Sequence, residues 1–268
     1  MNQNIERSIH DLREMDALAS GDSMVHRVSA GAKLLVTVVY IGTVVSFAKL
    51  NMTGLLFMVL YPVLLFTVSG IPISTCFYKL RFVLPLVLFV GVFNPFFDRT
   101  PAFAIGSFTV TTGMISMVTL MMKGVFCLMA SFLLMATTRI EALCGALRKI
   151  HMPQMLVTLL LLTFRYAAVM AEEVNVMTQA YSLRAPGQKG IHYTAWGSFL
   201  GQLLLRSMDR ADELYSSMLL RGYHGEFYYA ETKKRSSGDT LYAAIWCAAF
   251  LAARCVNLTQ VLGMTVVR

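Results

Sequence analysis

The feature that most constrains this chain is a series of apolar runs whose lengths approach that of a membrane-crossing helix. A helix needs roughly 18 to 20 largely apolar residues to cross a hydrocarbon layer of ~30 Å. Such runs occupy residues 34–47, 54–68, 82–97, 113–136 and 241–262. Hydrophobic residues make up 56% of the chain and charged residues only 14%, as is typical of membrane proteins. The sequence therefore predicts an all-α integral membrane protein with five transmembrane helices.

The positively charged residues predict how these helices are oriented. Lysine and arginine gather in the connections on the cytoplasmic side of bacterial membrane proteins. One side of the predicted spans carries Arg7, Arg13, Arg27, Lys33, Lys79, Arg81, Arg139, Arg148 and Lys149, and the other only Lys49 and Arg99. The N-terminus also lacks the apolar core of a signal peptide. We therefore expect a cytoplasmic N-terminus, a cytoplasmic region after the fourth span, and a C-terminus on the outside.

This reading divides the chain into four parts. Residues 1–33 form a cytoplasmic N-terminal segment, residues 34–136 a four-helix transmembrane region, residues 137–239 a cytoplasmic or interfacial helical region, and residues 240–268 the last transmembrane helix and the C-terminus. The connection from Asp98 to Thr112 links the third and fourth spans.

The region 137–239 is helical and apolar without forming clean spans. Thr138 and Glu141 have the spacing of a capping box, in which each side chain binds the other residue's backbone N–H. Pro153 is expected to end one helix and start the next. After it, ten apolar residues precede Arg165, and Glu172 follows. This run is too short and too charged for an ordinary span, which predicts a helix on the membrane surface or packed on other helices.

Two segments of this region end on an arginine. Acidic residues at Glu172 and Glu173 precede Arg184, and acidic residues at Asp209, Asp212 and Glu213 precede Arg221. A small residue, Ala180 or Ser217, stands four positions before each arginine, and proline or glycine follows closely. The pattern predicts two helices that begin acidic and end basic, in keeping with the helix dipole. The arginines are then either ordinary helix caps or exposed groups suited to binding carboxylates on a partner.

These motifs resemble the coupling helices of energy-coupling-factor transporter T components. The stretches "GDSMVHRVSAGAKLL" (21–35), "VGVFNPFFDR" (90–99), "LLLLTFRYAAVMAEEV" (159–174) and "GQLLLRSMDRADELYSSMLLRGYHGE" (201–226) are similar to the CbiQ group, the T component of cobalt transporters. The resemblance covers nearly the whole chain. It implies a multi-pass protein of the bacterial or archaeal cell membrane that links ATPases to a substrate-binding membrane protein.

The resemblance also implies partners and roles for particular residues. Arg184 and Arg221 match the motif arginines that dock into two ATP-binding-cassette ATPases of the CbiO or EcfA type, and Gly222 matches the glycine that follows. Ala185 and Pro186 stand where many relatives have glycine, which is a departure from the pattern. The other partner is a CbiM-like substrate-binding subunit, with or without a CbiN-like one. The implied cargo is cobalt, with nickel or a vitamin as the alternative.

Several kinds of chemistry lack their sequence signatures. No G-x-x-x-x-G-K-[ST] motif occurs, so ATP would be hydrolysed by a partner subunit. The five histidines and five cysteines are scattered without metal-binding spacing, and no nucleophile–base pattern lies within the spans. No Lys/Arg-rich block indicates nucleic-acid binding. We therefore expect no catalytic residue, no cofactor and no metal site in this chain.

Lys123 is the exceptional charge, because it lies near the middle of the fourth predicted span. A lysine at that depth must pair with other groups, snorkel or face other protein. A structural role against other helices and a role in a transport path both remain open. A secondary transporter unrelated to the T components is the rival function, although such proteins usually show paired repeats of their membrane spans.

Overall fold

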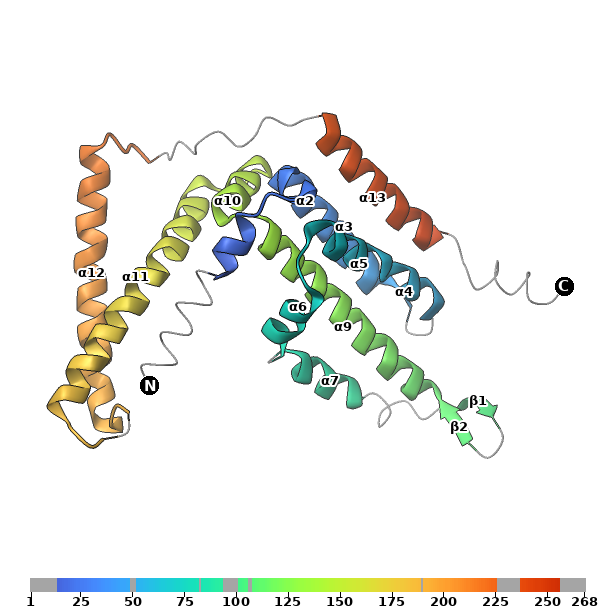
Figure 1. Cartoon of the computed structure of the whole chain (residues 1–268), viewed down its shortest axis with the longest axis horizontal. Helices are drawn as coiled ribbons and strands as arrows, with labels where there is room; N and C mark the ends of the chain where they lie inside the picture. The colour runs from blue at the N-terminus through green and yellow to red at the C-terminus, as the bar shows by residue number, and fades with distance from the viewer. Residues whose placement is uncertain are drawn as a thin grey trace. The chain divides into compact units, whose positions relative to one another are not determined.

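The structure is a computed structural model that describes residues 14–48, 52–81, 83–93, 101–105, 108–188, 190–225 and 237–255. The chain divides into two compact units (Figure 1). We call residues 19–138 and 233–268 the membrane unit, and residues 1–18 and 139–232 the helix-pair unit. Apart from one hairpin, the regular elements of the described residues are helices. The predicted class, an all-α membrane protein, is confirmed.

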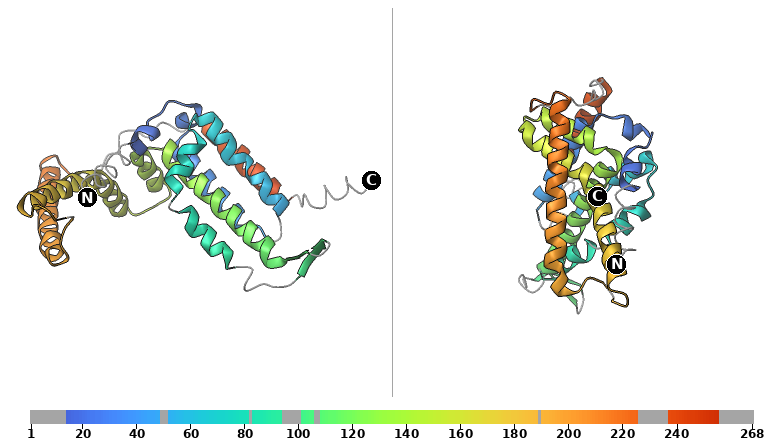
Figure 2. Two further views of the ribbon diagram at one scale, coloured as in Figure 1. Left: turned by 60° about the horizontal axis from the view of Figure 1, so that its bottom comes forward. Right: turned by 90° about the vertical axis from the view of Figure 1, so that its left-hand side faces the viewer.

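The membrane unit is built around one long helix, α9 (Thr112–Thr137). Helix α3 (Ala30–Ser46) packs between α9 and α13 (Ser237–Cys255), and α5 (Leu60–Ser69) and α7 (Leu84–Val92) also pack on α9. Figure 2 shows these helices side by side. Short elements complete the unit: α2 (Met24–Arg27), α4 (Met52–Met58), α6 (Ile73–Leu80), β1 (Pro101–Ile105) and β2 (Phe108–Thr111). The two strands pair in antiparallel fashion.

The second predicted span is broken, and proline explains one of its breaks. Pro62 has no N–H, so it cannot donate the helical hydrogen bond to the carbonyl of Met58. The buried Tyr40 hydroxyl donates to that carbonyl instead, at 2.9 Å. Further on, Gly70 has a φ of 71° and ends α5, and Pro72 precedes α6. The chain bends by 114° there.

An aromatic cluster joins three helices of the membrane unit. The Tyr40 and Tyr61 ring centroids are 4.6 Å apart, and Trp246 and Phe250 of α13 lie 4.8 and 5.2 Å from the Tyr61 ring. Aromatic pairs at such distances stabilise a protein in addition to the stabilisation from the area that they bury. The cluster therefore holds α13 against α3 and α5, although α13 is far from both helices in the sequence.

Glycines allow a close approach between α7 and α9. A Cβ atom on Gly124 of α9 would lie 2.4 Å from Cγ1 of Val87, and one on Gly91 of α7 would lie 2.9 Å from Cγ of Met121. Each helix therefore offers a gap to a side chain of the other. Small residues at helix contacts are common in membranes, where packing rather than the hydrophobic effect joins helices.

Between residues 139 and 225, the described part of the helix-pair unit contains three α-helices and one short 3-10 turn. They are α10 (Ile140–Lys149), α11 (Gln154–Arg184), the 3-10 turn η1 (Tyr193–Ala195) and α12 (Trp196–Leu220). Pro153 directly precedes α11, as predicted. The predicted capping box is wrong, because Arg139 is the N-cap of α10 and has no side-chain capping bond. The Thr138 hydroxyl lies instead 3.5 Å from the Lys33 amine.

The five predicted spans have different outcomes. Residues 113–136 lie in one long helix, as predicted, and residues 34–46 lie in α3. Within the third span the structure describes a helix only at Leu84–Val92, and residues 94–97 and 256–262 lie outside the described residues. Judged by length and composition, two described helices can cross a membrane, Thr112–Thr137 and Gln154–Arg184, with a third if the bent pair 54–69 and 73–80 forms one span. The count of five stays a prediction.

Helix α11 differs from its prediction in length. It continues through Arg165 and Glu172 and reaches 31 residues, whereas the sequence predicted a helix on the membrane surface or packed on other helices, from an apolar run judged too short for a span. The apolar run lies in its N-terminal half together with one charged residue, Arg165, and the other charged residues, Glu172, Glu173 and Arg184, lie in the C-terminal half. Counting the apolar run alone therefore underestimated the helix, because charges on an exposed face do not end it.

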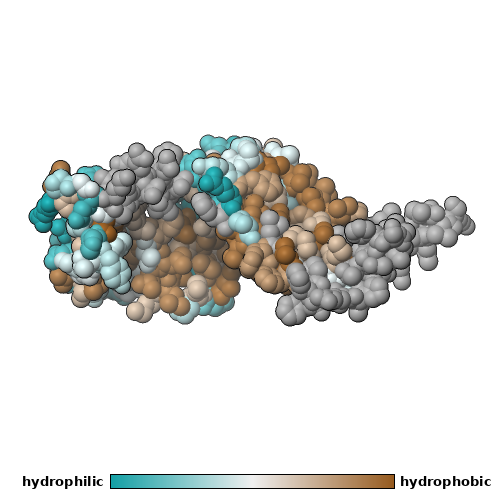
Figure 3. Space-filling view, turned by 90° about the horizontal axis from the view of Figure 1, so that it is seen from below, coloured by the Kyte–Doolittle hydropathy of each residue, from teal (hydrophilic) through white to brown (hydrophobic). Residues whose placement is uncertain are grey.

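Large apolar side chains are exposed on both units. Leu56, Leu86 and Phe89 of the membrane unit are more than half exposed, and so are Met155 and Leu159 of α11. Figure 3 shows broad brown, apolar areas on the face in view, and more teal and white at its left-hand end. Such surfaces are expected of helices that face lipid or other protein.

Candidate functional site

The candidate site consists of the C-terminal ends of α11 and α12, where the two motif arginines lie. At the end of α12, Arg221 is the C-cap. Gly222 follows with a φ of 82°. The N–H of Gly222 donates to the carbonyl of Leu219 at 2.9 Å, and the N–H of Tyr223 donates to that of Met218 at 3.0 Å. These two bonds form a Schellman motif, which fixes the direction in which the chain leaves Arg221.

The end of α11 is built differently. Pro186 disfavours helical geometry at Ala185, so the helix stops after Arg184. The N–H of Gln188 donates to the carbonyl of Ala185 at 3.3 Å, and Gly187 has a φ of 90°. Proline followed by glycine at the centre of such a turn is typical of type II. The departure at Ala185 and Pro186 therefore replaces a glycine cap with a proline turn and still places Arg184 at the helix end.

Tyr181 holds the turn after Arg184 in place. Its hydroxyl donates to Oε1 of Gln188 at 3.0 Å and accepts the N–H of His192 at 3.3 Å. The His192 Nδ1 in turn accepts from the backbone N–H of Thr194 at the start of the next helical segment. Hydrogen bonds thus link the end of α11 to the start of α12.

Both arginine side chains are exposed. Within the part of the chain that the structure describes, neither guanidinium has a hydrogen-bond or ion-pair partner. Ala180 and Ser217 are exposed as well, one turn before Arg184 and Arg221. Residues four apart lie on the same helix face, so each arginine stands beyond a small residue that leaves room for an approaching surface.

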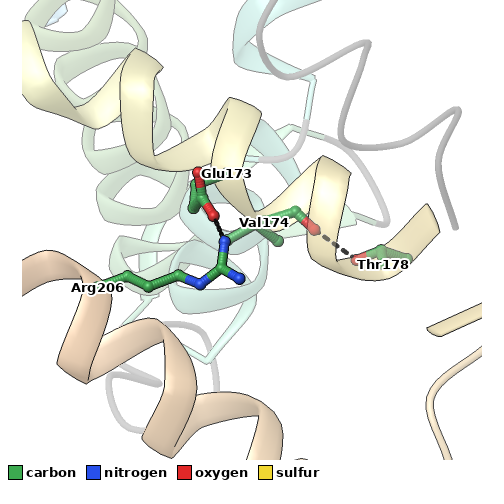
Figure 4. Close-up of polar contacts among 4 residues, drawn as sticks. All are labelled: Glu173, Val174, Thr178 and Arg206. Carbon is green, nitrogen blue, oxygen red and sulfur yellow. Dashed lines mark hydrogen bonds and ion pairs between the residues drawn. The ribbon is translucent and has the colours of Figure 1, made fainter. Parts of the chain in front are cut away.

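Helices α11 and α12 run antiparallel. The Gln154 side chain donates to the carbonyl of Gly225 at 3.0 Å, which joins the start of α11 to the chain just past α12. Glu173 and Arg206 form an ion pair further along (Figure 4). Arg184 lies about three helical turns beyond Glu173, and Arg221 lies about four turns beyond Arg206 in the opposite direction. At a rise of ~1.5 Å per residue the arginines are on the order of 40 Å apart.

The repeat predicted that acidic residues begin these two helices, and this prediction is wrong. Helix α11 starts at Gln154 and α12 at Trp196, so Glu172 and Asp209 lie in mid-helix. Glu173 binds Arg206 on the other helix, and Glu213 lies 3.4 Å from Arg210 on its own helix. Glu173 therefore joins the two helices and Glu213 pairs within α12, and only the basic ends agree with the dipole argument.

A cleft lies between α11 and α12. It has two adjoining parts, of about 510 and 430 Å³. The first part is lined by residues that include Arg165, Arg210, Ser217 and Arg221. The second part is lined mainly by apolar side chains, such as that of Met155. The sequence did not predict this cleft, because it depends on the angle at which two separate helices meet.

Lys123 donates two hydrogen bonds to backbone carbonyls at the end of α3. Its amine lies 3.2 Å from the carbonyl oxygen of Val45 and 2.5 Å from that of Phe47. These contacts agree with the structural alternative for Lys123. Two other cations in similar positions, Lys33 and Arg254, were not singled out from the sequence. Arg254 lies just beyond the most apolar part of the last span, which is the one signal that could have drawn attention to it.

The described residues contain no cluster of three or more histidine, cysteine, aspartate or glutamate side chains that could hold a metal ion. In the helix-pair unit, burial and the nearby Glu141 raise the pKa of the Cys144 thiol. The thiolate is the metal-binding form, so Cys144 is poorly suited to bind a metal ion. The candidate site therefore consists of contacts between helices and of charged groups at exposed helix ends.

Comparison with known proteins places the chain in a family. The family described as "CbiQ: Cobalt transport protein" matches residues 21–230. The chain is 27% identical over 243 residues to the energy-coupling factor transporter transmembrane protein EcfT of Lactococcus lactis, covering 84% of this chain and 91% of that protein.

Two further relatives match over shorter regions. The cobalt transport protein CbiQ of Rhodobacter capsulatus is 32% identical over 127 residues, covering 44% of this chain and 51% of that protein. The nickel permease LarQ of Lactiplantibacillus plantarum is 29% identical over 100 residues, covering 37% of this chain and 36% of that protein. The chain thus spans about a third to a half of the length of these two relatives. The family match extends over most of the chain and includes both arginine-ended helices, and the chain therefore belongs to the CbiQ family of energy-coupling-factor transporter transmembrane components.

Proposed function

We propose that this protein is the coupling subunit of an ATP-driven importer, linking two ATPase subunits to a substrate-binding membrane subunit. The observation that carries the proposal is the pair of exposed arginines at the C-terminal ends of α11 and α12. Because the helices are antiparallel, the arginines lie at opposite ends of the helix pair. A planar guanidinium binds carboxylates bidentately, so each arginine suits an acidic groove on one ATPase. Their separation, on the order of 40 Å along the helices, suits two ATPases rather than one.

The proposal assigns ATP hydrolysis to the partners. This chain contains no P-loop motif for holding a nucleotide phosphate. Similarity to proteins named as energy-coupling factor transmembrane components supports a complex with separate ATPases of the CbiO or EcfA type. The chain itself is then a non-catalytic subunit without a cofactor of its own.

The second partner is a substrate-binding membrane subunit of the CbiM type, with or without a CbiN-like chain. The N-terminal half of α11 supports this assignment, because Met155, Leu156, Leu159 and Leu160 expose apolar side chains there. Ser207, Arg210 and other polar residues of α12 lie across the cleft. An exposed apolar helix face suits a partner that is itself embedded in lipid.

Cobalt is the proposed cargo. The family description and the Rhodobacter relative both name cobalt. Nickel is the second candidate, because LarQ is called a nickel permease. A vitamin is the third, since the EcfT relatives carry no metal in their names. Selectivity would belong to the substrate-binding subunit, because the described part of this chain offers no metal-binding cluster.

Isolation of the intact complex tests this function. The tagged protein is purified from its native membrane in mild detergent, and its partners are identified by mass spectrometry. We expect two copies of ATP-binding-cassette subunits and one small membrane protein, and ATP-dependent uptake of 57Co into vesicles that contain the complex. Uptake of 63Ni in preference to 57Co would reassign the cargo. Isolation without any ATPase, with ion uptake independent of ATP, would contradict the proposal and favour a secondary transporter.

A further inference from the structure

The membrane unit contains two lysines that cap each other's helices. Lys33 of α3 is buried, and its amine donates to the backbone carbonyl of Thr137 at the end of α9, at 2.7 Å. Lys123 of α9 donates to the carbonyls of Val45 and Phe47 at the end of α3. Each helix therefore supplies a cation to the C-terminus of the other, where unpaired carbonyls and the negative end of the dipole favour positive charge.

Arg254 adds a third cation at the end of α3. Its guanidinium donates to the carbonyl of Ser46 at 3.2 Å and lies 5.3 Å from the centre of the Phe47 ring. Carbonyls at this helix end cannot rely on bulk water if they lie within a bilayer, so leaving them unpaired would be costly. Lys123 and Arg254 together satisfy three consecutive carbonyls, those of Val45, Ser46 and Phe47.

The two lysine contacts are in register with each other. Lys33 and Phe47 are about four helical turns apart on α3, and Lys123 and Thr137 are equally far apart on α9. At ~1.5 Å per residue both separations are about 21 Å, so both contacts form together when the helices lie antiparallel at one relative height. The contacts therefore define a single axial position of α3 on α9.

Between the lysine contacts lies a largely apolar seam. On α3, buried residues follow Lys33 at intervals of four and three, and on α9 the intervals are three and four. The members are Thr37, Tyr40, Val44 and Phe47 on α3, and Phe126, Ala130, Leu133 and Thr137 on α9. This is the spacing of antiparallel helices that pack by heptads. A repeating seam can also pack after one helix slides by about a turn along the other.

Apolar packing alone discriminates weakly between such positions in a membrane. Lipid tails are about as apolar as leucine, so moving an apolar side chain from the seam to lipid changes little hydrophobic free energy. A lysine amine differs, because carbonyls without an intrahelical N–H partner exist only at the C-terminal end of a helix. A single polar residue in an apolar helix contact can specify register in the same way.

We propose that Lys33 and Lys123 are positioning residues that lock α3 and α9 in one axial register. Lys33 acts where α9 ends, directly before Arg139 and the helix-pair unit. Lys123 acts at the other end of the seam, where its charged amine binds the backbone carbonyls at the end of α3. The lock makes α3 and α9 move together as one rigid pair. Its consequence for transport, that force on residue 139 moves both helices, rests on the proposed coupling function.

Distances between spin labels in the full-length protein test the register. Label pairs are placed at exposed positions in a background in which the five cysteines are replaced by serine. Leu35 and Met114 are about half exposed, and they lie about 21 residues, or about 32 Å, apart along the pair. This pair reports sliding directly. Leu35 and Met135 lie at nearly the same height, so their distance is insensitive to a small slide and serves as the matched control.

The expected result depends on the charge of the substituted residues. Lys33→Met and Lys123→Met should each broaden the Leu35–Met114 distance distribution. The double methionine variant should add a population displaced by about one helical turn, ~5 Å. Lys33→Arg with Lys123→Arg should restore the narrow distribution, because arginine still donates to carbonyls. The Leu35–Met135 distribution should stay in place throughout.

Two outcomes would overturn the lock. One is an unchanged Leu35–Met114 distribution in the double methionine variant, which would mean that apolar packing alone sets the register. The other is equal broadening in the arginine and methionine variants. If the double variant does not accumulate in membranes, Lys123→Met is compared with Lys123→Arg, and equal widths overturn the proposal. A shifted register with unchanged ATP-dependent uptake would leave the lock standing and contradict the proposed coupling function instead.

Discussion

Gly222 determines how Arg221 is presented at the end of α12. Its φ of 82° lies in the left-handed region, which a residue with a Cβ adopts at a cost. Gly222→Ala should destabilise the Schellman turn by about 1 kcal/mol and reduce retention of the ATPases although Arg221 is still present. Gly201→Ala is the matched control, since Gly201 lies inside α12 with open space around its Cα. Equal retention by both variants, measured by co-purification, would show that the turn does not position Arg221.

Features fixed by neighbouring residues could be predicted from the sequence, and contacts between distant residues could not. Arg184, Arg221 and their exposed surroundings follow from local patterns, because helix ends are specified by the next few residues. The partners of Glu173 and Lys123 could not be predicted, because they lie on other helices, far along the chain. The prediction of helices that start acidic was wrong for another reason: α11 starts at Gln154 and α12 at Trp196, well before their acidic residues.

At the scale of elements, the contact between α7 and α9 depends on two glycines. Gly124→Leu would place a side chain where Val87 now lies, so we expect a loss of about 1–3 kcal/mol and separation of α7 from α9. Gly42→Leu is the control, because nothing lies within 4 Å of a Cβ at that position of α3. The measurement is thermal stability in detergent. A Gly124→Leu variant as stable as Gly42→Leu would contradict the close contact.

Helix α11 is expected to act as the connection between ATPase and membrane. Leu160 is 41% exposed in this chain, so a partner or lipid would cover it in the complex. Leu160→Asn places an amide in that apolar contact. It should therefore lower uptake more than it lowers ATPase retention, because Arg184 and Arg221 stay in place. Uptake, hydrolysis and retention are measured on one preparation. A parallel fall in all three would indicate misfolding, and unchanged uptake would show that this face carries no coupling.

The element that formed one long apolar run was the most predictable. The limits of α9 differ from the prediction by one residue at each end, because an apolar run of that length has few alternatives in a membrane. The second span was less predictable. Pro62 and Gly70 interrupt it, and its broken hydrogen bond is replaced by Tyr40 from another helix. Such compensation depends on tertiary contact and cannot be read from the segment alone.

At the scale of the whole molecule, topology is the open prediction. The lysine and arginine distribution predicts a cytoplasmic N-terminus and a cytoplasmic position for residues 185–190. Single cysteines at Ser8 and Gln188 should then be labelled only after the membrane is permeabilised, and a cysteine at Arg99 should be labelled from outside. Labelling of Gln188 from outside would mean that α11, which is long and apolar enough to span, crosses the membrane.

In the proposed complex, Arg184 and Arg221 attach the ATPases. Losing one hydrogen-bonded charge pair at an interface costs ~2–5 kcal/mol, so a chain with two such contacts should lose much of its attachment when both are removed. The decisive measurement is the amount of ATPase that co-purifies with the Arg184→Ala, Arg221→Ala double variant at ordinary salt. Lys149→Ala, which removes an exposed cation from the last turn of α10, is the control. We predict near-complete loss of the ATPases from the double variant, with membrane abundance unchanged, and full retention by the control. Retention of the ATPases by the double variant at the level of the unsubstituted protein would contradict this role of the two arginines.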